Sequence, residues 1–201
     1  MTTDASWRTV PTSAPTGRAA VVSAVLGSAA ELYAEKGPTA TSIREVAARC
    51  GVNHGLVFRY FGTKERLIGA TLEHLGRRVA DLVAREAPPE LLEDALTIQT
   101  TVMARTLLEG YAIGDCQTVF PGVALLLDRI RPLHDTEHAA RMAAANAVAL
   151  QLGWRLFAPF LRASAGLTTE TDAEMREAIL AASARLADPD RRLRHRSDQS
   201  A

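Results

Sequence analysis

The segment GVNHGLVFRYFGTKERL (residues 51–67) concentrates hydrogen-bond donors, positive charge and aromatic rings. His54 has a ring N–H, Arg59 and Lys64 are cations, and Gly55 has no side chain to keep another molecule from the backbone. Three of the chain's aromatic residues (two Trp, three Tyr and five Phe in all) lie here. No nucleophile in the sequence is spaced to meet a base, so the segment suits the binding of an anion rather than catalysis.

Charge is distributed unevenly, although the net charge of the chain is zero. Residues 1–86 contain 11 Lys/Arg and 8 Asp/Glu, whereas residues 87–201 contain 12 and 15. Between residues 36 and 66 the cations are Lys36, Arg44, Arg49, Arg59, Lys64 and Arg66, against only Glu45 and Glu65. A local positive field of this kind is typical of nucleic-acid binding.

Four helices are predicted to position these residues, and no segment has the alternation of a strand. The first ends at Gly37-Pro38. A capping box, Ser42 to Glu45, opens a short second helix that Gly51 closes. Asn53 caps the third helix, which Gly62 ends, and Thr63 caps a fourth that runs to Glu86. The apolar faces of the first and fourth are Val22, Leu26, Ala29 and Tyr33, and Ile68, Leu72, Leu75, Val79 and Leu82.

The second and third helices, joined by a short turn at Gly51, form a helix-turn-helix pattern. Val52, Val57, Tyr60 and Phe61 are predicted to face inward, and His54, Gly55, Phe58 and Arg59 outward. Such a helix can enter a DNA major groove, about 12 Å wide, if its first residues are small or form hydrogen bonds. Leu56 can then meet a thymine methyl and Arg44 a guanine, while Ser42 and Lys64 are placed to meet phosphates.

The stretch TSIREVAARCGVNHGLVFRYFGTKERL resembles the TetR/AcrR family of one-component transcriptional regulators. The resemblance is strong over residues 18–70 and has a weaker echo at LGWRLFAPFLRASAGL (residues 152–167). It implies DNA-facing positions for Ser42, Arg44, Asn53, His54, Gly55, Leu56, Phe58, Tyr60 and Lys64. Phe58 stands where the family usually has a tyrosine whose hydroxyl binds a phosphate. That contact is missing unless Tyr60 or Arg59 substitutes for it.

Longer helices, rich in Ala and Leu, are predicted beyond Pro89. They cover about Glu90 to Glu109, a segment after Pro121, Asp135 to Ala165 with a kink at Pro159, and Thr171 to Ala187. The expected fold is therefore all-α, with an N-terminal three-helix DNA-binding domain and a C-terminal bundle. The predicted parts are an arm (1–17), the DNA-binding domain (18–62), a connecting helix (63–86), an effector-binding and dimerisation domain (87–187) and a basic tail (188–201).

Few residues of the second half have the chemistry of a binding site. Tyr111, Gln117 and His138 are polar among apolar neighbours, and Trp154 and Phe157 belong to an aromatic cluster near Pro159. These are the candidate ligand-binding residues. Exposed loop positions for the polar ones, and core or interface packing for the aromatic ones, are the alternatives. His134 and His138 have metal-binding spacing, but Asp135 is expected to cap a helix between them and no third ligand is spaced suitably, so no metal is predicted.

A homodimer is expected through the last two long helices. Ala140, Ala144, Ala147, Ala178 and Ala182 allow close helix approach, and Trp154, Ile179 and Leu186 supply apolar area. The alternative is that these faces form the core of one subunit. Cys50 and Cys116 are expected to be buried, reduced thiols.

The predicted function is a regulator that binds a palindromic operator in duplex DNA, acts as a repressor and is released by a small apolar molecule. No signal peptide or membrane span is recognisable, which favours the cytoplasm. No cofactor and no membrane partner are expected. The alternatives are a transcriptional activator and an architectural DNA-binding protein without an effector. An enzyme has no specific motif in its favour.

Overall fold

The computed structural model describes residues 17–188. The predicted N-terminal arm and basic C-terminal tail therefore lie outside the described residues, apart from Gly17 and Asp188. The fold is all-α, as predicted, since the described residues form helices and turns and no strand. Two compact units divide at Pro121 and Gly122. The functional boundaries at residues 62 and 86 stay a prediction.

The helices agree closely with the predicted limits. In the first unit they are α1 (Arg18–Lys36), α2 (Ile43–Arg49), α3 (His54–Phe61), α4 (Lys64–Ala84), α5 (Pro89–Leu108) and the short α6 (Ile113–Cys116). In the second they are α7 (Pro121–Ile130), the 3-10 turn η1 (Arg131–Leu133), α8 (Glu137–Ala165) and α9 (Asp172–Ala187). The sequence did not predict α6 and η1, because elements this short have no apolar period to recognise.

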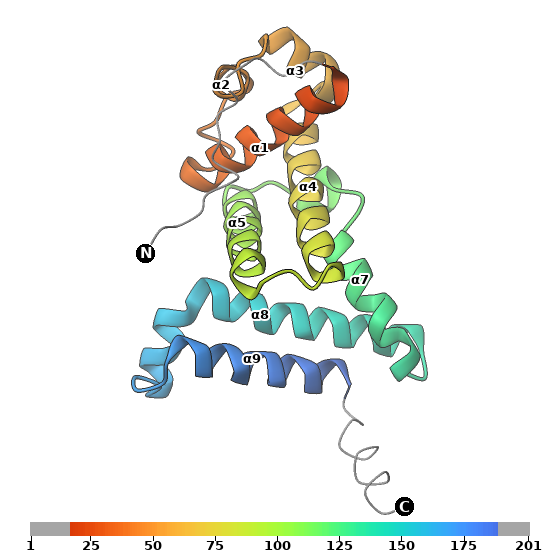
Figure 1. Ribbon diagram of the computed structural model, residues 1–201, viewed down its shortest axis with the longest axis vertical. Coiled ribbons are helices and arrows are strands. Elements are labelled where there is room, and N and C mark those ends of the chain that lie inside the picture. Colours follow the sequence, from red (N-terminus) through yellow and green to blue (C-terminus); the bar gives the residue numbers. More distant parts are fainter. Residues whose placement is uncertain (1–16, 189–201) are drawn as a thin grey trace, which may run out of the picture. The chain divides into compact units, whose positions relative to one another are not determined.

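In the first unit, α1, α2 and α3 group around the N-terminal end of α4, and α5 lies alongside α4 (Figure 1). All five predicted apolar residues of α4 are buried, from Ile68 to Leu82. On α1 the predicted face is incomplete. Val22 is only half-buried, and Val21, Val25 and Leu32 join Leu26, Ala29 and Tyr33 in the core. The reason is that α1 contacts α2, α4 and α5, so more than one stripe of this helix is covered.

Residues 116–121, which connect α6 to α7, pack closely against one face of α4. A Cβ added to Gly69 would overlap the backbone carbonyl of Cys116, and one added to Gly76 would come within 3.1 Å of Pro121. Between these glycines, Glu73 Oε1 accepts from the backbone N–H of Thr118 at 3.2 Å and of Val119 at 3.3 Å. The segment that leads into the second unit is thus fastened to the middle of α4.

In the second unit, α8 and α9 lie side by side (Figure 1). Thr136, not the predicted Asp135, caps α8, because its Oγ1 accepts from the N–H of Ala139 at 3.1 Å. The predicted kink is present, with non-helical angles at Phe157 (φ −120°, ψ 15°), two residues before Pro159. Arg162 holds the turn to α9 through an ion pair of 2.7 Å with Asp172 and hydrogen bonds to the carbonyls of Leu167 and Glu170.

No helix within residues 17–188 is both long and apolar enough to span a membrane. Cys50 is buried, as predicted, but Cys116 is only partly buried because it ends the short surface helix α6. Burial raises the pKa of both thiols.

The close approach at Gly69 gives a test of the packing on α4. We expect Gly69→Ala to destabilise the protein by about 1–3 kcal/mol, since the added methyl must displace the backbone at Cys116. Gly27→Ala, in the middle of α1, is the matched control because no atom lies within 4 Å of its added Cβ. It should stabilise the helix by about 0.5–1 kcal/mol. Urea unfolding measures both, and equal stability of the two variants would contradict the seating of residues 116–121 on α4.

Candidate nucleic-acid interface

The helix α3 presents the two faces that the sequence predicted. Val57 is fully buried, and Val52, Tyr60 and Phe61 pack against the core of the first unit. On the opposite face His54, Gly55, Phe58 and Arg59 are exposed, with Phe58 as much as 62% accessible. A single exposed aromatic ring is common on protein surfaces, but here it lies beside His54 and Arg59 on one helix face.

Local hydrogen bonds fix the start of α3. Asn53 is exposed and caps the helix, its Oδ1 accepting from the N–H of Gly55 at 2.8 Å. A Cβ on Gly55 would lie 3.1 Å from that oxygen, so a glycine fits here better than a larger residue. His54 is thereby held at the first helical position, with its ring in solvent. Leu56 is half-buried and packs against the core, so only part of its side chain is available to a partner.

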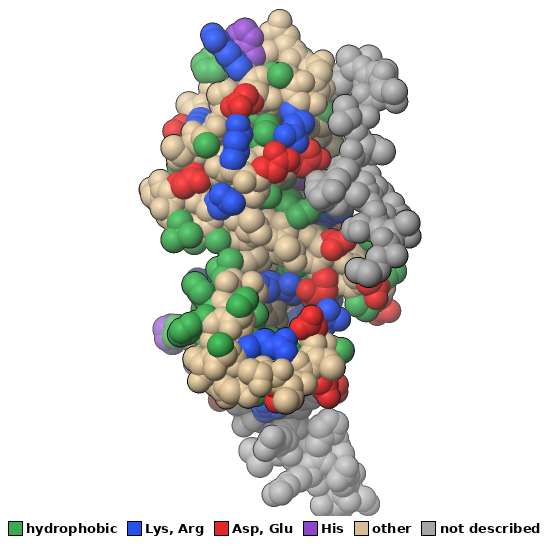
Figure 2. Space-filling model, turned by 90° about the vertical axis from the view of Figure 1, so that its left-hand side faces the viewer, with side chains coloured by type: hydrophobic (Ala, Val, Ile, Leu, Met, Phe, Trp, Pro, Cys, Tyr) green, Lys and Arg blue, Asp and Glu red, His purple; other side chains and the backbone are tan. Residues whose placement is uncertain are grey.

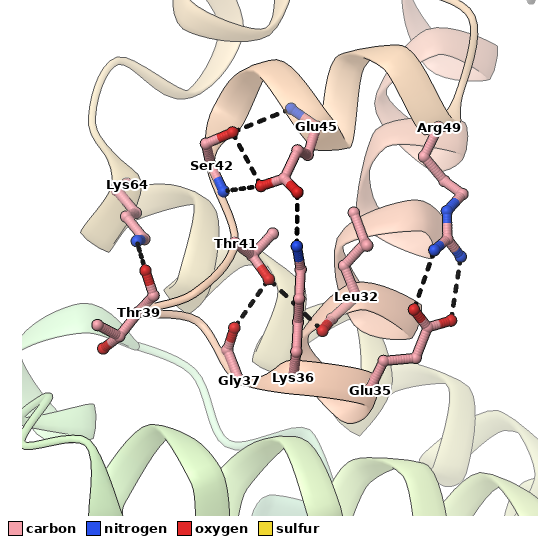
Figure 3. Close-up of polar contacts among 10 residues, drawn as sticks. All are labelled: Leu32, Glu35, Lys36, Gly37, Thr39, Thr41, Ser42, Glu45, Arg49 and Lys64. Atoms are coloured by element: carbon pink, nitrogen blue, oxygen red, sulfur yellow. Dashed lines mark hydrogen bonds and ion pairs between the residues drawn. The ribbon is translucent and has the colours of Figure 1, made fainter.

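The start of α2 is held by the predicted capping box (Figure 3). Ser42 Oγ accepts from the N–H of Glu45 at 3.2 Å, and Glu45 Oε2 accepts from the N–H of Ser42 at 2.8 Å. Lys36 reaches the same carboxylate, with Nζ 2.5 Å from Oε1. The hydrogen bond from Lys36, followed by those from Ser42, lowers the pKa of Glu45 to about 2. Ser42 is exposed at the start of α2, two residues before the exposed Arg44.

The positive charge is smaller than the sequence suggested, because two of the six cations are neutralised. Lys36 pairs with Glu45, and Arg49 pairs with Glu35 at 2.9 Å and Glu31 at 3.1 Å. On the face of the first unit that Figure 2 shows, basic and acidic side chains are interspersed and form no continuous basic patch. Arg44 and Arg59 form no ion pair with residues 17–188 and lie on α2 and α3. These unpaired guanidinium groups are the cations best placed to meet phosphate or guanine.

Lys64 begins α4 and points back toward the turn between α1 and α2 (Figure 3). Its Nζ donates to the backbone carbonyl of Thr39 at 3.1 Å. The ammonium group is therefore held near the start of α2, where Ser42 directly follows the buried Thr41 of the turn. The structure thus brings Ser42 and Lys64, the two residues predicted to contact phosphate, to the same end of the first unit. Their contact with phosphate stays a prediction.

Two residues of this surface, Arg18 and Thr39, were not predicted from the sequence. Arg18, at the start of α1, places its guanidinium carbon 5.8 Å from the centroid of the Tyr60 ring. Thr39 is exposed and links Lys64 to the α1–α2 turn. Neither could be found by local pattern, because each contact joins residues that are distant in the sequence. Tyr60 keeps part of its surface exposed, and this arginine covers its ring.

The five candidate ligand-binding residues are divided between the two units. Tyr111 is half-buried against the first core, and Gln117 is buried with its Nε2 donating to the carbonyl of Val119 at 2.6 Å. In the second unit Trp154 is half-buried, whereas His138 is exposed and Phe157 is 57% accessible. Sequence analysis also missed Ser183 on α9, whose buried Oγ has no hydrogen-bond partner among the described residues. The ligand-binding roles stay predictions.

The two histidines with metal-binding spacing are held differently. His134 Nε2 lies 2.8 Å from the carbonyl oxygen of Ala187, and His138 is exposed on the first turn of α8. Within residues 17–188, no three His, Cys, Asp or Glu side chains come together as a metal site would require.

The comparison with known proteins covers most of the chain. Residues 25–71, from the middle of α1 into α4, match the family described as bacterial regulatory proteins, tetR family. A Mycobacterium tuberculosis protein named an HTH-type transcriptional repressor is 52% identical over 175 residues, which are 87% of this chain and 93% of that protein. A Mycobacterium bovis protein named an HTH-type transcriptional regulator matches with the same identity and coverage. No solved structure matches the chain. With its helix-turn-helix of α2 and α3, this chain belongs to the tetR family of bacterial regulatory proteins.

Proposed function

We propose that the protein is a cytoplasmic transcriptional repressor that binds a palindromic operator as a homodimer and is released by a small apolar molecule. The exposed face of α3 supports this most directly. It combines His54, Gly55, Phe58 and Arg59, held in place by the Asn53 cap and the buried Val57. The relative named a repressor, which is 52% identical to this chain over 175 residues, supports repression over activation.

The side chains of the first unit divide into two proposed roles. His54 and Arg44 are donors aimed outward from helix starts, so they are proposed to read base edges in the major groove, with Gly55 allowing close approach. Ser42, Asn53, Lys64, Arg59 and Tyr60 are proposed to meet the DNA backbone. Phe58 lacks a hydroxyl, so its proposed contact is apolar, as is that of the half-buried Leu56. Arg59 is exposed and is therefore the better replacement for the phosphate contact of the missing hydroxyl.

The affinity for duplex DNA is expected to depend on the salt concentration and on the residues to which these roles are assigned. On a fragment selected from genomic DNA, log affinity should fall linearly with log salt concentration. Lys64→Ala should weaken all duplexes about equally and reduce the salt slope by about 1. Arg44→Ala and His54→Ala should cost about 1–3 kcal/mol on the preferred fragment and little on random duplex.

Fluorescence anisotropy measures these affinities. The matched control is Arg85→Ala, because Arg85 is an exposed cation that ends the same helix as Lys64. At 1.5 Å per residue it lies about 30 Å from Lys64, beyond the screening length. A wild-type protein that prefers no fragment over random duplex at moderate salt would contradict the proposed function.

The homodimer is proposed to form through apolar side chains of α8 and α9, with one correction to the predicted surface. Ala140, Ala144 and Ala147 are buried within the chain, so they form the core of one subunit and cannot be the contact. Ala178 is exposed, while Trp154, Ile179 and Ala182 are partly exposed. The exposed large apolar residues of the two helices are Met142, Leu156, Phe157, Phe160, Leu180 and Leu186. So much apolar area on one helix pair is typical of an interface.

Negative charges introduced by substitution on this surface should dissociate the proposed dimer. We expect the double variant Ile179→Glu/Leu186→Glu to sediment as a monomer, because burying two carboxylates in an apolar contact is costly. Its circular dichroism should remain helical. Leu108→Glu is the control, since Leu108 is 87% exposed on α5 and outside the proposed interface. A wild-type chain that sediments as a monomer at micromolar concentration would remove the homodimer from the proposal.

Ligand response is proposed to act through α4. Its first residue, Lys64, contacts the α1–α2 turn, and its middle is fastened at Glu73 to the segment that leads into the second unit. A ligand can shift DNA binding only if it has different affinities for the two arrangements of the protein. The connection between Glu73 and residues 118–119 offers a route by which occupancy of the second half moves α4. The apolar character of the second-half helices favours an apolar ligand.

The coupling between the binding of operator DNA and the binding of the small molecule must be reciprocal. For a compound found by thermal-shift screening of apolar small molecules, operator DNA should weaken its binding by the same factor by which the compound weakens DNA binding. Glu73→Ala should reduce that factor, because α4 is then less firmly joined to residues 118–119. Calorimetric titrations with and without operator measure it. Identical compound affinities in both titrations would leave a DNA-binding protein whose second half serves another purpose.

A further inference from the structure

Two side chains from outside the turn between α1 and α2 (residues 37–41) form hydrogen bonds with the same residue of that turn. The N–H of Thr39 donates to Oε2 of Glu109 at 2.6 Å, and the carbonyl of Thr39 accepts from Nζ of Lys64 at 3.1 Å. Lys64 is the first residue of α4, and Glu109 directly follows the last residue of α5. One peptide segment of the candidate DNA-binding part is therefore fixed by the ends of two long helices.

Both side chains lie where their own helices disfavour their charge. The N-terminal end of a helix carries partial positive charge and the C-terminal end partial negative charge. A lysine at the start of α4 and a glutamate at the end of α5 each oppose that dipole. Neither residue is thus explained by the stability of its helix. Their common feature is the contact with Thr39.

Gly37 provides the space that the Glu109 carboxylate occupies. A Cβ added to Gly37 would overlap Oε1 of Glu109, and Gly37 has φ of +83°, a value that favours glycine. The carboxylate therefore lies directly over the backbone of the turn. It contacts the turn at two points, over Gly37 and at the N–H of Thr39.

The turn is internally rigid, so that a hold on Thr39 positions all of it (Figure 3). Thr41 is buried, and its Oγ1 donates to the carbonyl of Gly37 at 2.8 Å, while its N–H donates to the carbonyl of Pro38 at 3.1 Å. Ser42, the cap of α2, follows at once. A displacement of Thr39 must therefore move the start of α2 together with the ammonium of Lys64.

We propose that Glu109 is a positioning residue for DNA binding: its carboxylate ties the end of α5 to Thr39 and so fixes Ser42, α2 and Lys64 in the arrangement that meets DNA. This rests on the proposed function. Preorganisation of this kind raises affinity because the turn and the lysine need not be ordered on binding. It also gives α5 a direct influence on the DNA-binding elements, in addition to that of α4.

The sign of the effect separates this role from simple electrostatics. Removal of a carboxylate lowers repulsion toward DNA, so electrostatics alone predicts that Glu109→Gln and Glu109→Ala both bind operator more tightly. Positioning predicts the opposite order. Glu109→Ala should bind roughly three- to tenfold more weakly than wild type, the size of effect expected for the net loss of one typical hydrogen bond. Glu109→Gln, which keeps an acceptor for the N–H of Thr39, should have an operator affinity between those of the wild type and Glu109→Ala.

The experiment measures operator affinity by anisotropy and amide hydrogen exchange of Thr39 in the full-length wild type, Glu109→Ala and Glu109→Gln. Glu90→Gln is the charge-matched control, since Glu90 is exposed on the first turn of the same helix, and it should change affinity less than about twofold. The expected result is faster Thr39 exchange in Glu109→Ala together with weaker operator binding by its folded fraction.

Three results would overturn the proposal. Operator affinity that is unchanged or raised in Glu109→Ala would show that the contact does not serve DNA binding. Weaker binding with unchanged Thr39 exchange would show that Glu109 acts elsewhere. Loss of thermal stability with unchanged operator affinity of the folded protein would reduce the contact to a structural one. Failure of the proposed function is distinct, because the wild type would then prefer no operator, whatever the exchange of Thr39.

Discussion

The burial of one stripe of α4 is the constraint on which the rest of the first unit depends. Leu67, Ile68, Leu72 and Leu75 are buried in one cluster with Tyr33 of α1, Val46 of α2, Val57 of α3 and Val102 of α5. The helix-turn-helix therefore shares its core with α4 and α5. A three-helix set of about 45 residues buries little apolar area by itself, and α4 and α5 add to its core. DNA-binding and connecting parts consequently cannot move as independent bodies without exposing part of this cluster, which favours a few discrete arrangements over gradual displacement.

Features encoded by neighbouring residues were predictable from the sequence. The caps at Ser42, Asn53 and Thr63, the two faces of α3 and the buried stripe of α4 all follow from spacings within one or two helical turns. The errors have the same physical origin. Asp135 and Thr136 are both good caps, and only the backbone decided between them. The alanines of α8 have the pattern of a close helix contact, but periodicity cannot tell a contact within one chain from a contact between two, and Ala140 and Ala144 proved to be core.

Contacts between distant residues could not be predicted, and they change the electrostatics of the candidate site. A count of charges treats Lys36 and Arg49 like Arg44 and Arg59, although the first two pair with Glu45, Glu35 and Glu31. Ion pairs of this kind, exposed to solvent, add little stability, but they hold side chains in place and confine the positive field to a few groups. The role of Thr39 could not be predicted either, because this residue has no charge and belongs to no sequence motif. Its importance comes from the two side chains that meet at its backbone, and these lie 25 and 70 positions away in the sequence.

Two rigid helices that end at one turn form a more constrained connection than either helix alone. Helix α4 is about 30 Å long and α5 nearly the same, so a small change of angle at one end produces a larger displacement at the other. If only α4 met Thr39, such a change could be absorbed by the flexible side chain of Lys64. With Glu109 on the N–H and Lys64 on the carbonyl, a relative movement of α4 and α5 beyond the reach of these two side chains must break one hydrogen bond or displace the turn. The position of Ser42 and α2 thus depends on how α4 and α5 are placed relative to each other. Of these two helices, α4 is the one that is hydrogen-bonded through Glu73 to the segment leading into the second unit.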